Sequence, residues 1–259
     1  MKRYILLCFL LAIWGVGGLC FAQSFRSRNR GSKLELPVIR TGEQVIVHIG
    51  YTTSYNSKTL NPDWVAYELT KEEVQGECKG KTSFCWDPDV KGRKSRREDY
   101  KNEQDWDKGH MAPRADMKWS VQAFEESYYL SNICPQNHDL NAGDWLKTEN
   151  LARRMAEKYG KVYIVCGPVF TVNRHGTLGE NKVWIPDAFY KALLVAVNGR
   201  YEAIAFYMTN ESQKNDLKSY IKTVDDIEKL VGRDLFPALS DSIEEEVESR
   251  VSRVVWGLK

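Results

Sequence analysis

Asp107-Lys108-Gly109-His110-Met111-Ala112-Pro113 begins the part of this 259-residue chain that decides its fold. Histidine titrates near neutral pH, at about 6.5 when unperturbed, so its neutral ring can accept a proton from water. His110 follows a glycine, beside which a backbone can approach a ligand closely, and precedes Ala112-Pro113, which resists a regular element. A lone histidine is more often structural than catalytic, but this loop position makes His110 a candidate general base.

Three polar residues of the helical segment Asp139–Tyr159 could act together with His110. Asn141 can cap the helix, but its amide oxygen also suits Mg²⁺, which binds oxygen ligands and keeps several waters. Glu149 lies about 80° around an ideal helix from Asn141, so the two share a face and Glu149 could hold a metal-bound water. Arg153 either forms a surface ion pair with Glu149 or holds its guanidinium over a phosphate. Together these residues predict cleavage of a phosphodiester with one Mg²⁺ ion.

These motifs resemble those of the DNA/RNA non-specific endonuclease family, whose active site is the ββα-metal motif. The family signature D-R-G-H followed by Ala-Pro stands here as Asp107–Pro113. The family pattern that follows it is present as Ser131–Gln136, Leu140-Asn141, Trp145, Glu149 and Arg153. The resemblance extends from about Val45 to Phe236, so it covers most of the chain.

The resemblance implies a role for each matching residue. His110 would be the general base that activates water. Asn141 would be the single direct protein ligand of Mg²⁺, for which Mn²⁺ could substitute. Asn132 would support the site by hydrogen bonding, Glu149 would orient metal-bound waters, and Arg153 would bind the phosphate.

Two departures from the family pattern concern positive charge. Lys108 stands where the family usually has arginine, and it keeps the charge but loses the bidentate fork. The family also places another arginine upstream, and no equivalent is evident between Lys81 and Arg97. The run Lys91–Arg97 holds five cations and is either a solvated face or a phosphate-binding surface. We therefore expect weaker or differently arranged contacts to phosphate.

The remaining sequence mixes strands and helices without a regular βαβ alternation, which favours an α+β fold. We expect a mixed, largely antiparallel sheet with flanking helices and a ββα-metal active-site motif. The expected strands are Val45–Tyr51, Trp64–Thr70, Lys161–Phe170, and a hairpin of Phe189–Asn198 and Arg200–Met208 about Asn198-Gly199. The other expected helices are Ala123–Leu130, Thr223–Val231 and Ser242–Val254. The acidic C-terminal helices would suit DNA poorly, so we expect them away from the active site.

The first 22 residues have the pattern of a secretory signal, with Lys2 and Arg3 before an apolar run that ends at Ala22. An uncleaved anchor is the alternative. We expect a secreted or periplasmic protein without stable membrane association, a flexible basic leader over residues 23–44, and a single nuclease domain over residues 45–259. The formal charge of the whole chain is +2, so losing the two signal cations leaves 2 − 2 = 0. Nucleic acid would then be bound by a local basic patch.

The four cysteines beyond the signal segment allow three full pairings. An exported protein can keep disulfides, and Cys78 and Cys85 flank a short polar loop, so they are the best pair. Cys166 reads as a small buried residue of a strand, while the state of Cys134 stays open. The cysteine spacing does not suit a structural zinc site.

Taken together, the residues and the resemblance predict a secreted Mg²⁺-dependent endonuclease of DNA and RNA without strong sequence specificity. One alternative is a nuclease-like module that binds nucleic acid but has reduced turnover. Another is a phosphodiesterase that acts on smaller substrates. The sequence does not determine whether a protein inhibitor binds it.

Overall fold

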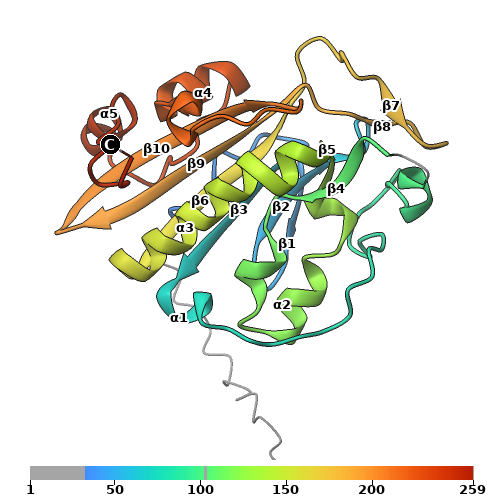
Figure 1. Ribbon diagram of the computed structural model, residues 1–259, viewed down its shortest axis with the longest axis horizontal. Coiled ribbons are helices and arrows are strands. Elements are labelled where there is room, and N and C mark those ends of the chain that lie inside the picture. The colour runs from blue at the N-terminus through green and yellow to red at the C-terminus, as the bar shows by residue number, and fades with distance from the viewer. Residues whose placement is uncertain (1–32, 102–103, 259) are drawn as a thin grey trace, which may run out of the picture.

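The computed structural model describes residues 33–101 and 104–258, and seven strands of this part form one sheet (Figure 1). The strand order is β1-β2-β3-β6-β9-β10-β11, and every neighbouring pair is antiparallel. The strands are β1 (Gln44–Val47), β2 (Thr52–Asn56), β3 (Asn61–Thr70), β6 (Lys161–Val169), β9 (Ala188–Val197), β10 (Arg200–Thr209) and β11 (Ile221–Lys222). The expected α+β class with a largely antiparallel sheet is confirmed.

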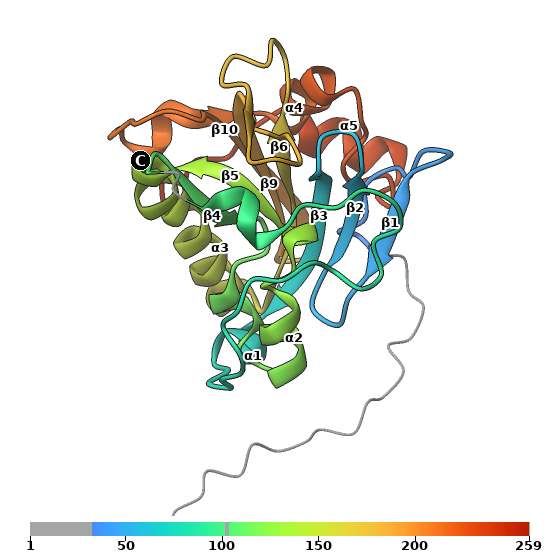
Figure 2. The ribbon, with the colours of Figure 1, turned by 90° about the vertical axis from the view of Figure 1, so that its right-hand side faces the viewer.

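Helices cover both faces of this sheet (Figures 1 and 2). α3 (Leu146–Tyr159) packs on one face through apolar residues that include Leu151 and Met155. α4 (Val224–Val231) and α5 (Asp241–Glu248) pack on the other face through residues that include Ile227 and Val247. Each such side chain contributes about 1.5–3 kcal/mol on burial. The acidic C-terminal helices therefore lie across the sheet from α3.

The structure also contains shorter elements. They are α1 (Lys71–Val74), α2 (Val121–Glu126), the hairpin β4 (Trp106–His110) and β5 (Ile133–Asn137), the small pair β7 (Thr177–Leu178) and β8 (Val183–Trp184), a π-helical turn (Leu140–Trp145), and 3₁₀ turns at Arg97–Tyr100, Arg114–Met117, Leu130–Asn132 and Leu217–Tyr220.

The hairpin of β9 and β10 forms as the sequence predicts. Asn198 and Gly199 have φ angles of 49° and 79°, and positive φ at both central residues characterises the two-residue turn that suits strand twist. α4 ends at Val231 as expected and begins one residue later than expected, because Thr223 is its cap: Thr223 Oγ1 accepts a hydrogen bond from Asp226 N at 3.1 Å, and Gly232 ends the helix with φ 62°.

Among the expected elements that differ from the structure are one strand and two short helices. The strand over Val45–Tyr51 is interrupted, because a turn closed by a 2.8 Å hydrogen bond from His48 N to Tyr51 O separates β1 from β2. α2 begins two residues earlier than expected, since Ser120 Oγ accepts from Ala123 N at 3.4 Å and fixes its start. α5 ends at Glu248 rather than Val254.

Only part of the N-terminal region, residues 33–44, is described by the structure. The signal segment and residues 23–32 lie outside it. Residues 33–44 pack against the body instead of forming a flexible leader: Leu34 is 9% exposed, and Val38 N donates to Asp234 O at 2.9 Å. In the part of the chain that is described, the helices are too short or too polar to cross a bilayer.

The expected disulfide between Cys78 and Cys85 is wrong. The two residues are held by different segments: Cys78 N donates to Lys118 O at 2.8 Å, and Leu130 N donates to Cys85 O at 2.9 Å. These backbone contacts spread the intervening loop along the body. Across residues 33–101 and 104–258, no disulfide forms. Cys166 is buried in β6, as predicted.

Candidate active site

Two strands and a helix carry the candidate site. β4 pairs antiparallel with β5, and the chain then passes through the π-helical turn into α3, which lies beside the hairpin (Figure 2). His110 ends β4 opposite Ile133, and Asn141 lies in the π-helical turn. This is the ββα arrangement that the sequence predicts, with a π-helical turn at the start of its helix.

The π-helical turn changes the expected position of Asn141. Neither Asp139 nor Asn141 caps the helix; Asn137 Oδ1 accepts from Asp139 N at 3.0 Å and from Leu140 N at 3.3 Å. A π-helical turn holds more residues than an α-helical one, so the 80° relation between Asn141 and Glu149 does not hold. Asn141 is thus released from capping. Single π-helical turns of this kind are frequent at functional sites.

Asn132 fixes the backbone just beyond His110. Its Oδ1 accepts from Ala112 N at 2.8 Å, and its Nδ2 donates to Ala112 O at 2.9 Å. Met111 N also donates to Asn132 O at 2.9 Å. Asn132 is fully buried, so these bonds are shielded from water.

A buried polar pair supports the segment that carries Asn132. The Asp87 carboxylate accepts a hydrogen bond from Ser131 Oγ and lies 2.9 Å from His48 Nε2. Burial raises the pKa of Asp87, but the contacts with His48 and Ser131 outweigh it and hold the pKa below its usual value.

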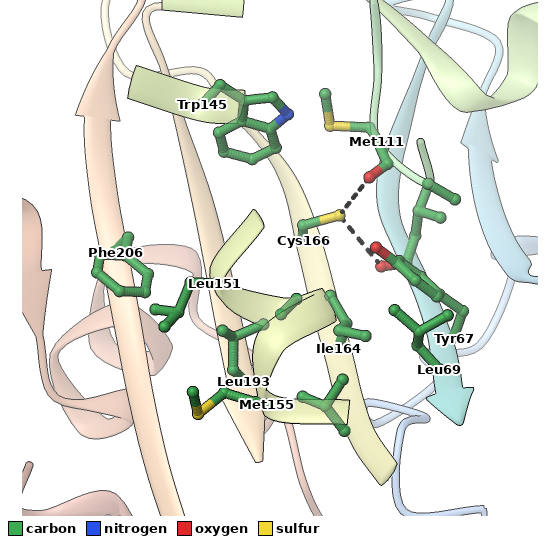
Figure 3. Packing of buried hydrophobic residues seen from close by; sticks show 14 of the residues in the cluster. Tyr67, Leu69, Met111, Trp145, Leu151, Met155, Ile164, Cys166, Leu193 and Phe206 are labelled. Carbon is green, nitrogen blue, oxygen red and sulfur yellow. Dashed lines mark hydrogen bonds between the residues drawn. The ribbon is translucent and has the colours of Figure 1, made fainter. Parts of the chain in front are cut away.

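The hydrophobic core holds His110 from the other side. Cys166 Sγ donates to Met111 O at 3.3 Å, and Trp145 lies next to Met111 (Figure 3). Trp145 Nε1 in turn donates to His110 O at 3.3 Å. The backbone at His110 and just after it is therefore anchored.

Gly109 is needed for packing between strands. A Cβ at this position would overlap the side chain of Gln136 on β5. The close approach that the sequence analysis expected to a ligand is instead an approach to a neighbouring strand.

The imidazole of His110 is buried among aromatic rings and favours its neutral form. The rings of Phe84 and Tyr128 lie 5.4 Å and 5.3 Å from it, centroid to centroid. Burial, aided by the charge of Arg114, lowers the pKa of His110 to about 4. Its Nε2 atom is buried and has no hydrogen-bond partner among the described residues. At neutral pH this nitrogen can accept a proton.

The amide of Asn141 is oriented by Asp107 of the same motif. Asn141 Nδ2 donates to Asp107 Oδ2 at 2.8 Å, and His138 Nδ1 lies 3.0 Å from the same oxygen. This orientation leaves the amide oxygen as the group available to a cation. A carbonyl oxygen beside a carboxylate fits Mg²⁺, which needs few protein ligands because it keeps several waters.

Glu149 and Arg153 join a buried network, and its centre is a residue that the sequence analysis missed. Asp116 is fully buried; its Oδ1 lies 2.6 Å from Arg153 Nη1, and its Oδ2 accepts from Tyr67 Oη at 2.9 Å. Arg153 Nη2 lies 3.9 Å from Glu149 Oε2. The main partner of Arg153 is therefore Asp116, and the surface pair with Glu149 that the sequence suggests is secondary.

Lys191 completes this network from β9. Its side chain is fully buried, and its Nζ lies 4.1 Å from the centroid of the Trp145 ring. Burial raises the pKa of Glu149 to about 7, although the charges of Lys191 and Arg153 oppose the rise. Asp116, Glu149, Arg153 and Lys191 thus act on one another electrostatically.

A family model described as DNA/RNA non-specific endonuclease matches residues 31–242 of this chain. The chain belongs to this family. The mitochondrial nuclease EXOG of Xenopus laevis is 32% identical over 215 residues, which are 77% of this chain and 60% of that protein. A nuclease of Serratia marcescens is 33% identical and matches 79% of each chain. A solved complex of EndoG with EndoGI has the same fold, with a TM-score of 0.70 at 24% identity over 77% of this chain and 88% of that one.

The comparisons confirm the resemblance and correct the expected location. Human endonuclease G, at 28% identity over 70% of this chain, the yeast nuclease, and the EXOG relatives are all named as mitochondrial proteins. The expectation of a secreted or periplasmic protein, drawn from the N-terminal pattern, is therefore wrong. The match spans only 58% to 62% of the length of the EXOG relatives.

In this endonuclease-family chain, the side chains of Lys108 and Arg114 contact aromatic rings close to His110. Lys108 Nζ lies 5.3 Å from the centroid of the Tyr100 ring, and burial followed by the charge of Arg97 lowers the pKa of Lys108. The exposed Arg114 donates from Nη1 to Tyr128 Oη at 3.4 Å, and the Tyr128 ring contacts the imidazole. The basic run therefore ends next to the motif.

The sequence does contain signals that could have pointed to Asp116, Arg114 and Lys191. Arg114 and Asp116 follow directly after the Ala112-Pro113 pair that ends the motif. Lys191 is the lysine inside the apolar strand Ala188–Val197, and a buried lysine is rare unless it is paired.

Asp116→Asn is expected to destabilise the protein by about 3–5 kcal/mol, because it removes the buried carboxylate that pairs with the partly exposed Arg153 and lies near the buried Lys191. Urea unfolding of wild type and variant measures the difference. Asp105→Asn at an exposed position is the control, with an expected change within about 0.5 kcal/mol. Equal stability of Asp116→Asn and wild type would contradict a stabilising role for the pair of Asp116 with Arg153.

Proposed function

We propose that the protein is a metal-dependent endonuclease that hydrolyses phosphodiester bonds of DNA and RNA without strong sequence specificity. His110 is the general base, and Asn141 is the protein ligand of Mg²⁺ or, in its place, Mn²⁺. The observation that supports this most is the neutral, unpaired Nε2 of His110 on the strand whose Asp107 orients the amide of Asn141.

The steps follow from the groups that the chain supplies. Nε2 of His110 accepts the proton of the attacking water, and the anchored backbone and the rings of Phe84 and Tyr128 hold the imidazole in place. Glu149, once ionised, accepts hydrogen bonds from water in the site and orients it. Mg²⁺ held by Asn141 would supply Lewis-acid chemistry for the phosphoryl and leaving oxygens.

Several cationic side chains are available to bind the phosphates of the substrate. Arg153 is preorganised by Asp116, and its side chain remains 17% exposed, so part of the guanidinium is accessible to a phosphate. Lys108 and Arg114, which contact the aromatic rings about His110, and Arg97 beside Lys108 add local positive charge. Contacts of this kind grip the backbone and carry no base specificity. This local charge supports a nucleic-acid substrate for a chain whose formal charge is only +2.

The test is digestion of plasmid DNA and of RNA by the purified full chain, with Mg²⁺ and with EDTA. We expect cutting of both polymers with Mg²⁺ and none with EDTA, because the leaving oxygen then lacks its Lewis acid. Binding of nucleic acid without cleavage in Mg²⁺ or Mn²⁺ would overturn the proposal in favour of a binding module. Cleavage of a dinucleotide analogue but not of the polymers would overturn it in favour of small substrates.

A further inference from the structure

Helices α4 and α5 bring three carboxylates together on the sheet face opposite α3. One carboxylate oxygen from each of Asp225, Glu228 and Glu248 lies within 4.8 Å of the other two. Asp225 and Glu228 lie one turn apart on α4, and Glu248 is the last residue of α5. Ionised groups at such separations repel each other unless a cation or protons lie between them.

Glu248 is the member of this carboxylate cluster that points to a ligand. It is only 2% exposed, and its Oε1 is buried without a hydrogen-bond partner among the described residues. A buried carboxylate oxygen without a partner is costly, and native proteins rarely keep one. Its carboxylate is directed at those of Asp225 and Glu228.

The surroundings add negative rather than positive charge. Glu248 is buried, and the charges that act on it come from carboxylates: Asp225, Glu228, Asp234 and Glu244, while Asp241 acts on Glu244. Among the described residues, the ion pair that reaches the cluster is Lys229 with Asp225, at 3.7 Å on the exposed side of α4.

We propose that Asp225, Glu228 and Glu248 bind a divalent cation, Ca²⁺, at a second site that is separate from the catalytic centre. All three ligands are carboxylate oxygens, which suits a hard cation and not zinc. Ca²⁺ takes oxygen ligands at about 2.3–2.6 Å in flexible geometry, so oxygens up to about 5 Å apart can share one ion. Mg²⁺ requires a nearly ideal octahedron and holds its waters, so it fits this all-protein cluster less well.

The chain is already shaped to hold these ligands. Glu228 Oε1 accepts from Leu235 N at 2.7 Å, which fixes its side chain, and Thr223 caps α4 just before Asp225. The ion would join the end of α5 to the start of α4, and it would stabilise the C-terminal layer without contacting the catalytic residues. The site does not depend on the proposed nuclease activity.

The experiment compares Ca²⁺ binding by four full-length proteins at pH 7.5: wild type, Asn141→Ala, Glu248→Gln and Glu245→Gln. Glu245 is exposed on α5, so Glu245→Gln removes one charge from the same helix and serves as the matched control. Equilibrium dialysis with radioactive Ca²⁺ measures binding, and thermal unfolding with Ca²⁺ or EDTA measures the coupled stabilisation. Asn141→Ala removes the proposed Mg²⁺ ligand, so its remaining Ca²⁺ is bound elsewhere.

We expect wild type, Asn141→Ala and Glu245→Gln to bind Ca²⁺ and to unfold at a higher temperature with it. Glu248→Gln is expected to lose the thermal shift and at least about tenfold in affinity, as losing a ligand exceeds the usual effect of a supporting residue. If Glu248→Gln does not fold, Asp225→Asn at the half-buried edge replaces it. Ca²⁺ binding by the glutamine variant equal to that of wild type would overturn the proposal. The proposal would also be overturned if wild type bound no Ca²⁺ and Glu248→Gln were more stable than wild type in EDTA. In that case protons alone would relieve the repulsion between the carboxylates.

Discussion

His110→Ala is expected to lower kcat for plasmid cleavage by about 10²–10⁴-fold, the usual contribution of a positioned general base. The physical reason is the loss of the buried Nε2 that accepts the proton of water. Gel-based initial rates at saturating Mg²⁺ measure the effect. His175→Ala is the matched control, because the Nε2 of His175 is also buried and unpaired but its ring packs on Trp106. Loss of activity in both variants alike would contradict a specific role for His110.

The pH profile tests the same assignment. A base works in its deprotonated form, so a group with its pKa lowered to about 4 keeps activity until the pH falls through about 4. Glu149, with its pKa raised to about 7, must ionise to orient water, so in wild type we expect activity to fall first near pH 7. Glu149→Gln is expected to be slower but to lose this first limb and keep the one near pH 4. A limb at the ordinary histidine value in Glu149→Gln would contradict the neutral, buried imidazole.

Asn141→Ala is expected to lower activity by more than the roughly 10–100-fold that supporting residues of a metal site cost. It should also raise the Mg²⁺ concentration that gives half-maximal cleavage, since the proposed ligand oxygen is gone. A Mg²⁺ titration of initial rates measures both quantities. Ala142→Ser, an exposed neighbour in the same π-helical turn, is the control for a general disturbance of that turn.

Asn141→Asp separates the ligand oxygen from the orientation of the amide. The variant keeps an oxygen ligand but loses the Nδ2 donor to Asp107 and sets two carboxylates side by side. We expect an activity between those of wild type and Asn141→Ala. An unchanged Mg²⁺ requirement in Asn141→Ala would show that the residue is not the ligand and would leave only its contact with Asp107.

Local signals predict several features of the site and fold because they depend on neighbouring residues. The Asn198-Gly199 turn and the Thr223 cap each need only a few residues with suitable backbone preferences. The Asp107–Pro113 motif and the residues at fixed spacing after it likewise suffice to recognise the family, which the comparison over residues 31–242 confirms.

Features that join distant segments were not predicted. Arg153 binds Asp116, 37 residues away, and Lys191 reaches the Trp145 ring from β9. The loop between Cys78 and Cys85 is set by backbone contacts to two other segments, so short spacing alone suggested a disulfide that does not form. Such contacts depend on which strands and helices pack together, and local sequence does not encode that.

The sequence by itself determined the chemistry available to this protein: an imidazole, an amide, a carboxylate and a guanidinium in a fixed order along one hairpin and helix. Only the tertiary structure decided how each is used. Asn141 lies in the π-helical turn and does not cap the helix. Burial of His110 in the core lowers its pKa to about 4 and so favours the neutral imidazole. Burial and the orientation of polar groups are set by packing between distant segments, so they appear only once the sheet and both helical layers are in place.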